Sequence, residues 1–345
     1  MHKQLFFLLI LSSVSIGMAQ KNDLVVDGES HFAAIRQLTF GGQNAEGYFS
    51  FDERSLIFQS TRDSFECDQE YIIDLASGNS QLVSTGIGRT TCGYFLPEDK
   101  KILYASTHHL LASCPPPPDY SKGYVWAVYP EFDIFLSDRD GSNLTQLTTT
   151  PGYDAEATVS PLGDKMVFTS TRNGDLDLFA MNLDGSHIQQ LTNEVGYDGG
   201  AFYSWDGSKI IYRAGHYTDS SEAKRYMELL ATNLVRPTRL ELFVMNADGS
   251  GKQQVTSNGA ANFAPFFHPD NKRVIFASNL ADPKGRDFDL YLINIDGTGL
   301  ERITFNDSFD GFPMFTHDGK KLVFASNRKG KIRGETNLFL ADWKE

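Results

Sequence analysis

The sequence is poor in cysteine and in basic residues, and each shortage excludes a class of protein or partner. Its 345 residues include three cysteines, so one intramolecular disulfide is the most that can form. Acidic residues outnumber basic ones by 44 to 31, and the formal net charge is −13. Nucleic acids and anionic membrane surfaces both attract basic patches. We therefore expect neither of them as a partner.

The apolar stretch near the N-terminus, Leu5 to Ile16, is too short to span a membrane comfortably. It follows Lys3 and precedes Gly17-Met18-Ala19, which is the order of a secretory signal peptide and its cleavage site. We expect residues 1–19 to be a signal peptide and residues 20–33 to be a short N-terminal segment. The protein should then be exported, to the periplasm or outside the cell, with no transmembrane segment.

Common catalytic motifs are missing as well. The sequence contains no Gly-x-Ser-x-Gly, no His-Glu-x-x-His and no phosphate-cradling glycine loop. Enzymatic chemistry therefore has no motif to support it, and we expect no cofactor and no metal ion.

What the sequence does contain is a spacing that repeats six times. A first landmark recurs in each unit, at Asn44, Thr90, Asp154, Asp198, Asn262 and Asp310. Eighteen residues after each (44 to 62, and so on) stand Arg62, His108, Arg172, His216, Leu280 and Arg328. An apolar triplet such as Met166-Val167-Phe168 precedes each of these second landmarks. A fixed period of this kind is typical of a radial or stacked array.

Each unit predicts four short strands, and six units predict a six-bladed β-propeller. The second and third strands are short apolar runs, as strands buried on both faces are. Turns such as Asp184-Gly185 join the third strand to the fourth. The last unit ends after its third strand, Leu338 to Trp343, and residues 36–40 resemble the missing fourth strand. We expect an all-β, monomeric ring over residues 34–345, closed by its N-terminal strand.

All the length variation falls between second and third strands, so every insertion should leave the same face of the ring. Blade two inserts residues 109–132, and blade four inserts residues 217–240. Asp219 and Glu222 resemble a capping box, and an apolar stripe follows them, so we expect a short helix that ends before Pro237. The stripe contains Ala223, Tyr226, Met227, Leu230 and Leu234. The two insertions should flank a groove over blade three, where we expect a ligand to bind.

The candidate binding residues lie on this face or at the mouth of the central channel. They are His108, Trp126, Asp154, Glu156, Asp198, Arg213, His216, Tyr226 and Asp310. The recurring Asp or Asn has a structural alternative, which is to cap turns between blades. We expect Arg172 to pair with an acid that begins a third strand, such as Asp177. Arg213, His108 and His216 break the repeat, and the histidines either bind a metal ion or occupy the arginine's place.

The three cysteines fall in one sector of the ring. Cys92 lies in a first strand, while Cys67 and Cys114 lie in connections between second and third strands. We expect one disulfide and favour Cys92–Cys114 over Cys67–Cys92. A zinc site that includes His108 is the remaining alternative.

The repeat resembles that of a known family. Residues 160–172, Ser-Pro-Leu-Gly-Asp-Lys-Met-Val-Phe-Thr-Ser-Thr-Arg, with Leu178 to Ser186 and Leu191-Thr192, are similar to the TolB-type propeller repeat of bacterial envelope proteins. The resemblance covers nearly the whole chain after residue 19 and implies an exported six-bladed propeller. In TolB itself the propeller binds an envelope lipoprotein and follows an N-terminal α/β domain, for which residues 20–33 are too few. Similar propellers also cap prolyl oligopeptidase-type serine peptidases and form some sugar-acid lyases.

The leading hypothesis is a non-catalytic binding module that recognises a protein or an envelope polymer through the insertion-bearing face. The one-sided insertions and the missing catalytic motifs support it. The alternative is a metal-dependent hydrolase or lyase that uses His108, His216 and nearby acids at the channel mouth. Fold resemblance alone does not assign an activity.

Overall fold

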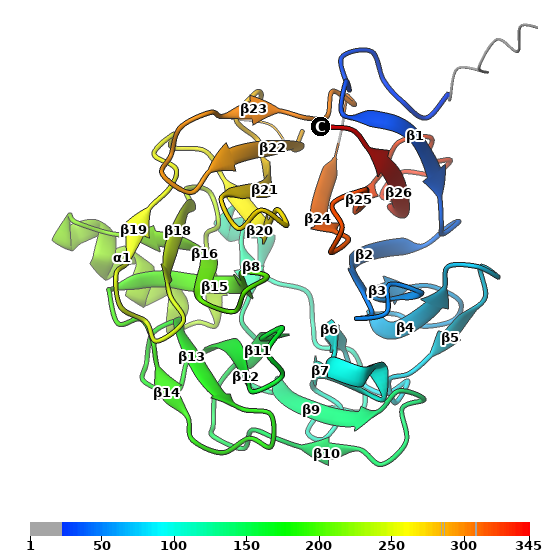
Figure 1. The fold of residues 1–345 in the computed structure, drawn as a ribbon. Coiled ribbons are helices and arrows are strands. Elements are labelled where there is room, and N and C mark those ends of the chain that lie inside the picture. The colour runs from blue at the N-terminus through cyan, green and yellow to red at the C-terminus, as the bar shows by residue number, and fades with distance from the viewer. Residues whose placement is uncertain (1–22, 284, 286, 308) are drawn as a thin grey trace, which may run out of the picture.

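The computed structural model describes residues 23–345 apart from residues 284, 286 and 308. Within the described residues the chain forms six four-stranded antiparallel sheets around a central axis, a six-bladed β-propeller (Figure 1). The signal peptide expected for residues 1–19 lies outside the described part. No helix of the described part has the length and apolar character needed to cross a membrane.

The blades follow one another in chain order, and each begins with the strand nearest the axis. Blade one contains β2 (Gln43–Phe49), β3 (Ser55–Thr61), β4 (Gln69–Asp74) and β5 (Ser80–Leu82). Blade two contains β6 (Thr90–Phe95), β7 (Lys101–Ser106), β9 (Asp133–Asp138) and β10 (Thr145–Gln146). Blade three contains β11 (Asp154–Val159), β12 (Lys165–Ser170), β13 (Asp177–Asn182) and β14 (Gln189–Gln190).

The second half of the ring repeats this plan. Blade four contains β15 (Gly196–Tyr203), β16 (Lys209–His216), β18 (Glu241–Asn246) and β19 (Gln253–Gln254). Blade five contains β20 (Asn262–Phe267), β21 (Arg273–Ser278), β22 (Asp289–Asn294) and β23 (Glu301–Arg302). Blade six contains β24 (Asp310–Phe315), β25 (Lys321–Ser326), β26 (Asn337–Trp343) and β1 (Phe32–Gln37).

The N-terminal strand closes the ring, as the repeat predicted. β1 pairs antiparallel with β26, which gives blade six the strand order β1-β26-β25-β24. The strand occupies residues 32–37 rather than the expected 36–40, because Phe32 and Ile35 are the side chains buried against the blade. Pairing of the two ends of the chain removes an open sheet edge.

The apolar triplets of the second strands form the core between blades. Met166, Val167 and Phe168 are fully buried, and so are the matching triplets of the other five blades. Each blade packs between two neighbours, so both faces of its sheet are buried, which explains why these runs do not alternate with polar residues.

In four of the six blades, those that begin at Asn44, Asp154, Asp198 and Asp310, the 18-residue interval of the repeat is a side-chain contact. Arg172 Nη2 donates to both carboxylate oxygens of Asp154 at 3.0 Å, and Arg328 Nη2 donates to Asp310 at 2.9 Å. The predicted pairing of Arg172 with Asp177 is therefore wrong. The arginine lies two residues past the second strand, and its guanidinium lies over the Phe168 and Phe179 rings while its hydrogen bonds go to the first strand.

The two insertions leave the same face and meet each other. β8 (Trp126–Ala127) of the blade-two insertion pairs antiparallel with β17 (Leu234–Val235) of the blade-four insertion. The joined insertions cover blade three, so the expected open groove is largely closed. A cavity of about 170 Å³ remains there, between residues of blade three, such as Tyr153, and insertion residues such as Met227 and Leu230.

The blade-four insertion contains α1 (Ser220–Leu230), the one α-helix of the described residues. Asp219 caps it by accepting hydrogen bonds from the backbone N–H groups of Ser221 and Glu222 at 2.9 and 3.0 Å. The helix ends at Leu230, earlier than the apolar stripe indicated, because Leu234 belongs to β17.

The disulfide differs from the predicted one. Cys67 and Cys114 are bonded, with their Cα atoms 5.9 Å apart, and Cys92 is a free thiol. The predictions of Cys92–Cys114 and Cys67–Cys92 are wrong, because Cys92 belongs to β6 and lines the channel whereas the other two lie in connections on the insertion-bearing face. The bond ties the blade-two insertion to blade one.

Candidate functional site

Each of the six first strands carries a β-bulge two residues after its first landmark. The strand register shifts at this point in every blade, and the residue there has a φ between 50° and 57°. In chain order these residues are Glu46, Cys92, Glu156, Gly200, Ala264 and Phe312. All of them line one cavity on the axis. A positive φ is uncommon outside glycine, and bulges of this kind re-aim a side chain.

We call these six residues the bulge ring. Its polar side chains all come from one half of the propeller. Blades one to three contribute Glu46, Cys92 and Glu156, while blades four to six contribute a glycine, an alanine and a phenylalanine. The cavity leaves about 20 Å³ for the centres of water-sized molecules, which is room for one or a few waters. The bulge ring is therefore a constriction of the channel.

Glu156 and Arg213 form an ion pair inside the constriction. Arg213 also donates to the Tyr197 hydroxyl at 2.7 Å, and that hydroxyl in turn donates to Glu156 at 3.2 Å. The Thr169 hydroxyl and the Gly200 N–H donate to the same carboxylate at 2.7 and 3.0 Å. Arg213 is only 7% exposed, so a buried cation and a carboxylate are held together by several hydrogen bonds.

Trp126 covers this pair from the insertion side. Its ring lies 5.3 Å from the Arg213 guanidinium carbon and 6.2 Å from the Phe263 ring. Because Trp126 belongs to β8, the paired insertions extend over the channel and close its end on that face.

Glu46 and Cys92 face each other across the other side of the constriction. Burial raises the pKa of Glu46 to about 7, and the Cys92 thiol that donates to it opposes this shift. Burial raises the pKa of the Cys92 thiol well above its ordinary value, and the Glu46 carboxylate adds to the effect. The thiol is therefore protonated at neutral pH, which is unlike a nucleophilic cysteine.

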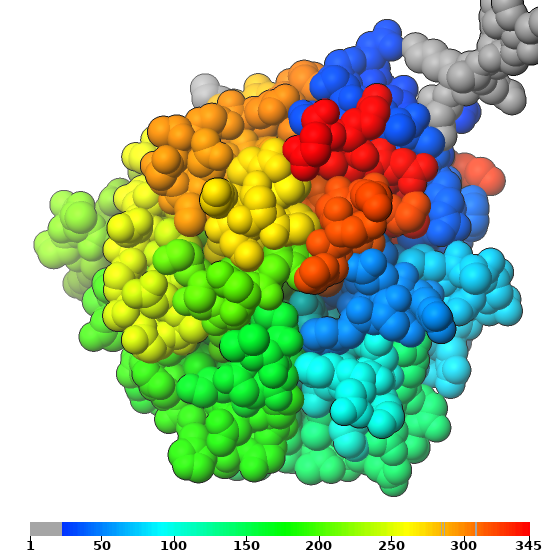
Figure 2. All heavy atoms as spheres, in the orientation of Figure 1, coloured from blue at the N-terminus to red at the C-terminus, as the bar shows by residue number. Residues whose placement is uncertain are grey.

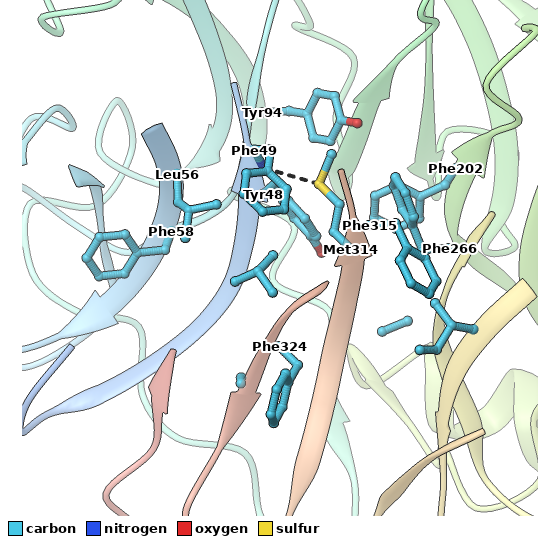
Figure 3. Packing of buried hydrophobic residues seen from close by; sticks show 14 of the residues in the cluster. Tyr48, Phe49, Leu56, Phe58, Tyr94, Phe202, Phe266, Met314, Phe315 and Phe324 are labelled. Carbon is cyan, nitrogen blue, oxygen red and sulfur yellow. Dashed lines mark hydrogen bonds between the residues drawn. The ribbon is translucent and has the colours of Figure 1, made fainter. Parts of the chain in front are cut away.

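A second ring, two residues further along the first strands, is mostly aromatic. It consists of Tyr48, Tyr94, Thr158, Phe202, Phe266 and Met314. Figure 3 shows the labelled side chains of this ring converging from different blades. The Tyr48 ring lies 5.4 Å from Phe202 and 5.6 Å from Tyr94, and Phe202 lies 5.4 Å from Phe266. These contacts separate the polar constriction from the opposite end of the channel.

The channel is open at the face formed by the turns between first and second strands. A cavity of about 250 Å³ lies there, and Figure 2 shows this face hollowed at its centre. We call it the aromatic mouth and define it by Phe51, Tyr94, Tyr203, Trp205, Phe266 and His317. The Trp205 ring lies 5.7 Å from Phe266 and 5.1 Å from His317, so rings from three blades meet at its edge.

The residues predicted from sequence do not form one site. Trp126, Glu156 and Arg213 come together at the insertion-side end of the channel, as described above. The acids Asp154, Asp198 and Asp310 are at most 1% exposed and pair inside their own blades.

His108 and Tyr226 lie apart from the channel residues. His108 lies 4.4 Å from the Phe135 ring, and its Nδ1 bonds to the Ser106 hydroxyl at 2.9 Å. Tyr226 lies on the buried side of α1, and its hydroxyl donates to Asp175 at 2.6 Å.

His216 belongs to a cluster that could hold a metal ion. Its Nε2 bonds to Asp198 Oδ1 at 2.8 Å, and a carboxylate oxygen of Glu194 completes a set of three donor atoms within 4.8 Å of one another. The cluster does not include His108, which lies in blade two.

Sequence reasoning missed the aromatic ring, the aromatic mouth and the role of Cys92 in the channel. A signal was present, because counting two and four residues from each first landmark reaches both rings. What the count does not reveal is the bulge, which decides that both sets of side chains face the axis.

No family model and no curated protein matches the sequence. Solved structures do match. TolB from Acinetobacter baumannii has a TM-score of 0.57 and 16% identity, with 77% of this chain and 55% of that chain covered. A protein with a provisional TolB assignment from Agrobacterium tumefaciens has a TM-score of 0.60 and 16% identity, with 90% and 94% covered. This chain therefore spans about half of the first structure and nearly all of the second.

An oligogalacturonate lyase from Vibrio parahaemolyticus is also similar, with a TM-score of 0.51, 12% identity and coverage of 89% of this chain and 93% of that one. At these identities the likeness establishes the fold, a TolB-like six-bladed propeller, and leaves the activity open.

Proposed function

We propose that this TolB-like propeller is a binding module of the cell envelope that holds an apolar protein segment in its aromatic mouth. One observation carries the proposal: the channel is open and lined by aromatic rings at the turn face, while Trp126 covers its polar constriction at the other end. Concave, mostly apolar sites of this kind are the usual places for ligands on a rigid scaffold.

The chemistry of the mouth favours a protein segment over a polysaccharide. A sugar polymer needs many hydrogen-bonding groups beside the aromatic rings. The two serines of the lining, Ser50 and Ser204, already donate to Asp52 and Asp206 at 2.7 and 2.6 Å. An apolar side chain of a partner needs only the rings.

An exported location is part of the proposal. The N-terminal sequence pattern supports it, and so does the Cys67–Cys114 disulfide, because such bonds persist in oxidising compartments such as the periplasm. The chain's net charge of −13 favours a partner that is neutral or basic.

The insertion-bearing face, which the sequence favoured, is the second surface to test. Its remaining cavity of about 170 Å³ lies against the paired insertions and is smaller than the mouth. Met227 of α1 is 38% exposed there, so it can report a partner that binds on that side.

Photo-crosslinking from both faces tests the proposal. With a photoreactive residue at position 162, beside the mouth, we expect a crosslinked envelope protein, and Phe51→Asp should reduce its yield at least tenfold. Phe40→Asp is the matched control, since Phe40 is 73% exposed and lies outside the mouth. Crosslinks only from position 227 would move the site to the insertion face, and a crosslinked polysaccharide would replace the protein partner.

The alternative, metal-dependent hydrolase or lyase chemistry, is favoured by one observation, the cluster of Glu194, Asp198 and His216. The cluster lies in blade four and the link that precedes it, away from the aromatic mouth. His108 does not belong to it, so the two histidines do not act on one ion.

A further inference from the structure

Blade four lacks the acid–arginine ion pair that joins the first and second strands of blades three and six. In blades three and six the acid at the start of the first strand pairs with an arginine, Arg172 or Arg328. In blade four the same place is taken by His216, which is shorter and offers Asp198 a single ring nitrogen at 2.8 Å. A second acid, Glu194, lies in the link just before β15 and joins this pair.

The buried acid of the cluster has an unused ligand atom. Asp198 is 0% exposed, and its Oδ2 has no hydrogen-bond partner among the described residues. An unsatisfied carboxylate oxygen inside a protein is costly unless a cation or a donor meets it. Glu194 is exposed, and its carboxylate pairs with Lys252 Nζ at 3.1 Å. A cationic group therefore already lies beside this carboxylate, where a metal ion would bind.

We propose that Glu194, Asp198 and His216 bind a zinc ion, which displaces the lysine from Glu194. One imidazole and two carboxylates suit zinc better than calcium or magnesium, which take oxygen ligands. Zinc needs ligand atoms about 3.3 Å apart at ordinary bond lengths. The three donor atoms already lie within 4.8 Å of one another, so small rotations suffice. Three protein ligands leave one coordination position for water.

The site is independent of the proposed partner binding. Asp198 is the third residue of β15 and His216 ends β16, so both lie at the insertion-bearing end of blade four. The aromatic mouth lies at the opposite end of the same strands. Loss of zinc binding and loss of partner capture are therefore separate outcomes.

Equilibrium dialysis of the purified full chain against zinc chloride, followed by metal analysis, tests the proposal. We expect one zinc ion per chain. Glu194→Gln, on an exposed residue, should weaken zinc binding at least tenfold. Lys252→Gln should strengthen it severalfold, because it frees Glu194 and removes a nearby positive charge.

His216→Arg is the sharpest variant, because it rebuilds the acid–arginine pair of blades three and six. The variant should unfold no earlier than the wild type on heating and should lose zinc binding. Zinc should raise the unfolding midpoint of the wild type and leave that of His216→Arg unchanged. If His216→Arg does not fold, Glu194→Gln decides the question.

The matched control is His108→Ala, which removes the histidine at the corresponding position of blade two. Zinc binding should be unchanged in this control. Less than one zinc per five chains, or an affinity that neither Glu194→Gln nor His216→Arg alters, would overturn the proposal.

Discussion

At the scale of single residues, one position of the repeat decides what the channel contains. The bulged residue of each first strand has a positive φ in all six blades, yet its identity varies from glutamate to glycine and phenylalanine. The backbone is therefore common to all blades, while the side chains differ from blade to blade. Variation on a constant backbone is what allows one ring to carry a site on a few blades only.

Glu46 should make the stability of the protein depend on pH. Burial raises its pKa in the folded protein to about 7, from 4.5. The folded state therefore holds this proton more tightly than the unfolded state, and the stability that it contributes is lost as the pH rises from 4.5 through 7. Glu46→Gln removes this dependence and should be more stable than the wild type by about 3 kcal/mol at pH 8.

Urea unfolding followed between pH 4.5 and pH 8 measures the effect. The difference between Glu46→Gln and the wild type should be near zero at the acid end and grow with pH. Glu228→Gln, on the exposed side of α1, is the control and should follow the wild type. A constant difference across the range would contradict the prediction.

At the scale of elements, the two insertions act as one unit. β8 and β17 pair with each other, α1 precedes β17, and the Cys67–Cys114 bond anchors the blade-two insertion to blade one. A strand pair of two residues each is weak by itself. We therefore expect the disulfide to hold the unit in place over blade three and Arg213.

Removal of the disulfide should loosen this unit. The bond spans 47 residues of sequence, and a loop of this size predicts a loss of about 2–4 kcal/mol in the Cys67→Ser, Cys114→Ser double variant. Hydrogen exchange should speed up in residues 107–132 and stay slow in β12, whose side chains form the core. Cys92→Ser is the control without a disulfide change. Unchanged exchange in residues 107–132 would show that the β8–β17 pair holds the insertions in place without the disulfide.

At the scale of the whole molecule, ring closure couples the N-terminal segment to all six blades. β1 supplies the fourth strand of blade six, and Glu29 just before it lies 3.0 Å from Arg328, which also pairs with Asp310. The first described residues therefore complete both a sheet and a buried ion-pair network.

Deletion of residues 23–37 should destabilise the ring strongly. Loss of the buried Phe32 and Ile35 side chains costs about 3–6 kcal/mol, and Arg328 loses one of its two carboxylates. Thermal unfolding of the deletion variant should begin far below that of the full chain. The exposed edge of β26 should also promote aggregation.

A circular permutant tests whether the deletion acts through the loss of β1 or through the new position of the chain end. Lys344 N–H donates to His31 O at 2.8 Å, whereas Leu24 O accepts from Arg328 at the other end of the blade. A flexible linker of about ten residues can therefore join residue 345 to residue 23, with new ends in the exposed turn at Gly78. This permutant keeps β1 beside β26 and should unfold close to the wild type. A permutant as unstable as the deletion would show that the continuity of the chain, and not β1, holds the ring closed.

The sequence alone determined the number of blades, the closing strand, the single face that bears the insertions and the cap of α1 at Asp219. These features follow from periodic spacing, turn residues and capping groups. Such signals act over a few neighbouring residues, so they can be recognised without knowledge of the tertiary structure. Only the tertiary structure decided that Arg172 pairs with Asp154 and that Cys67, not Cys92, bonds to Cys114. It also decided that β8 meets β17 and that the open mouth lies opposite the insertions. The physical reason is that these contacts join separate strands and blades, so they depend on how the bulged strands and the curvature of the ring aim each side chain.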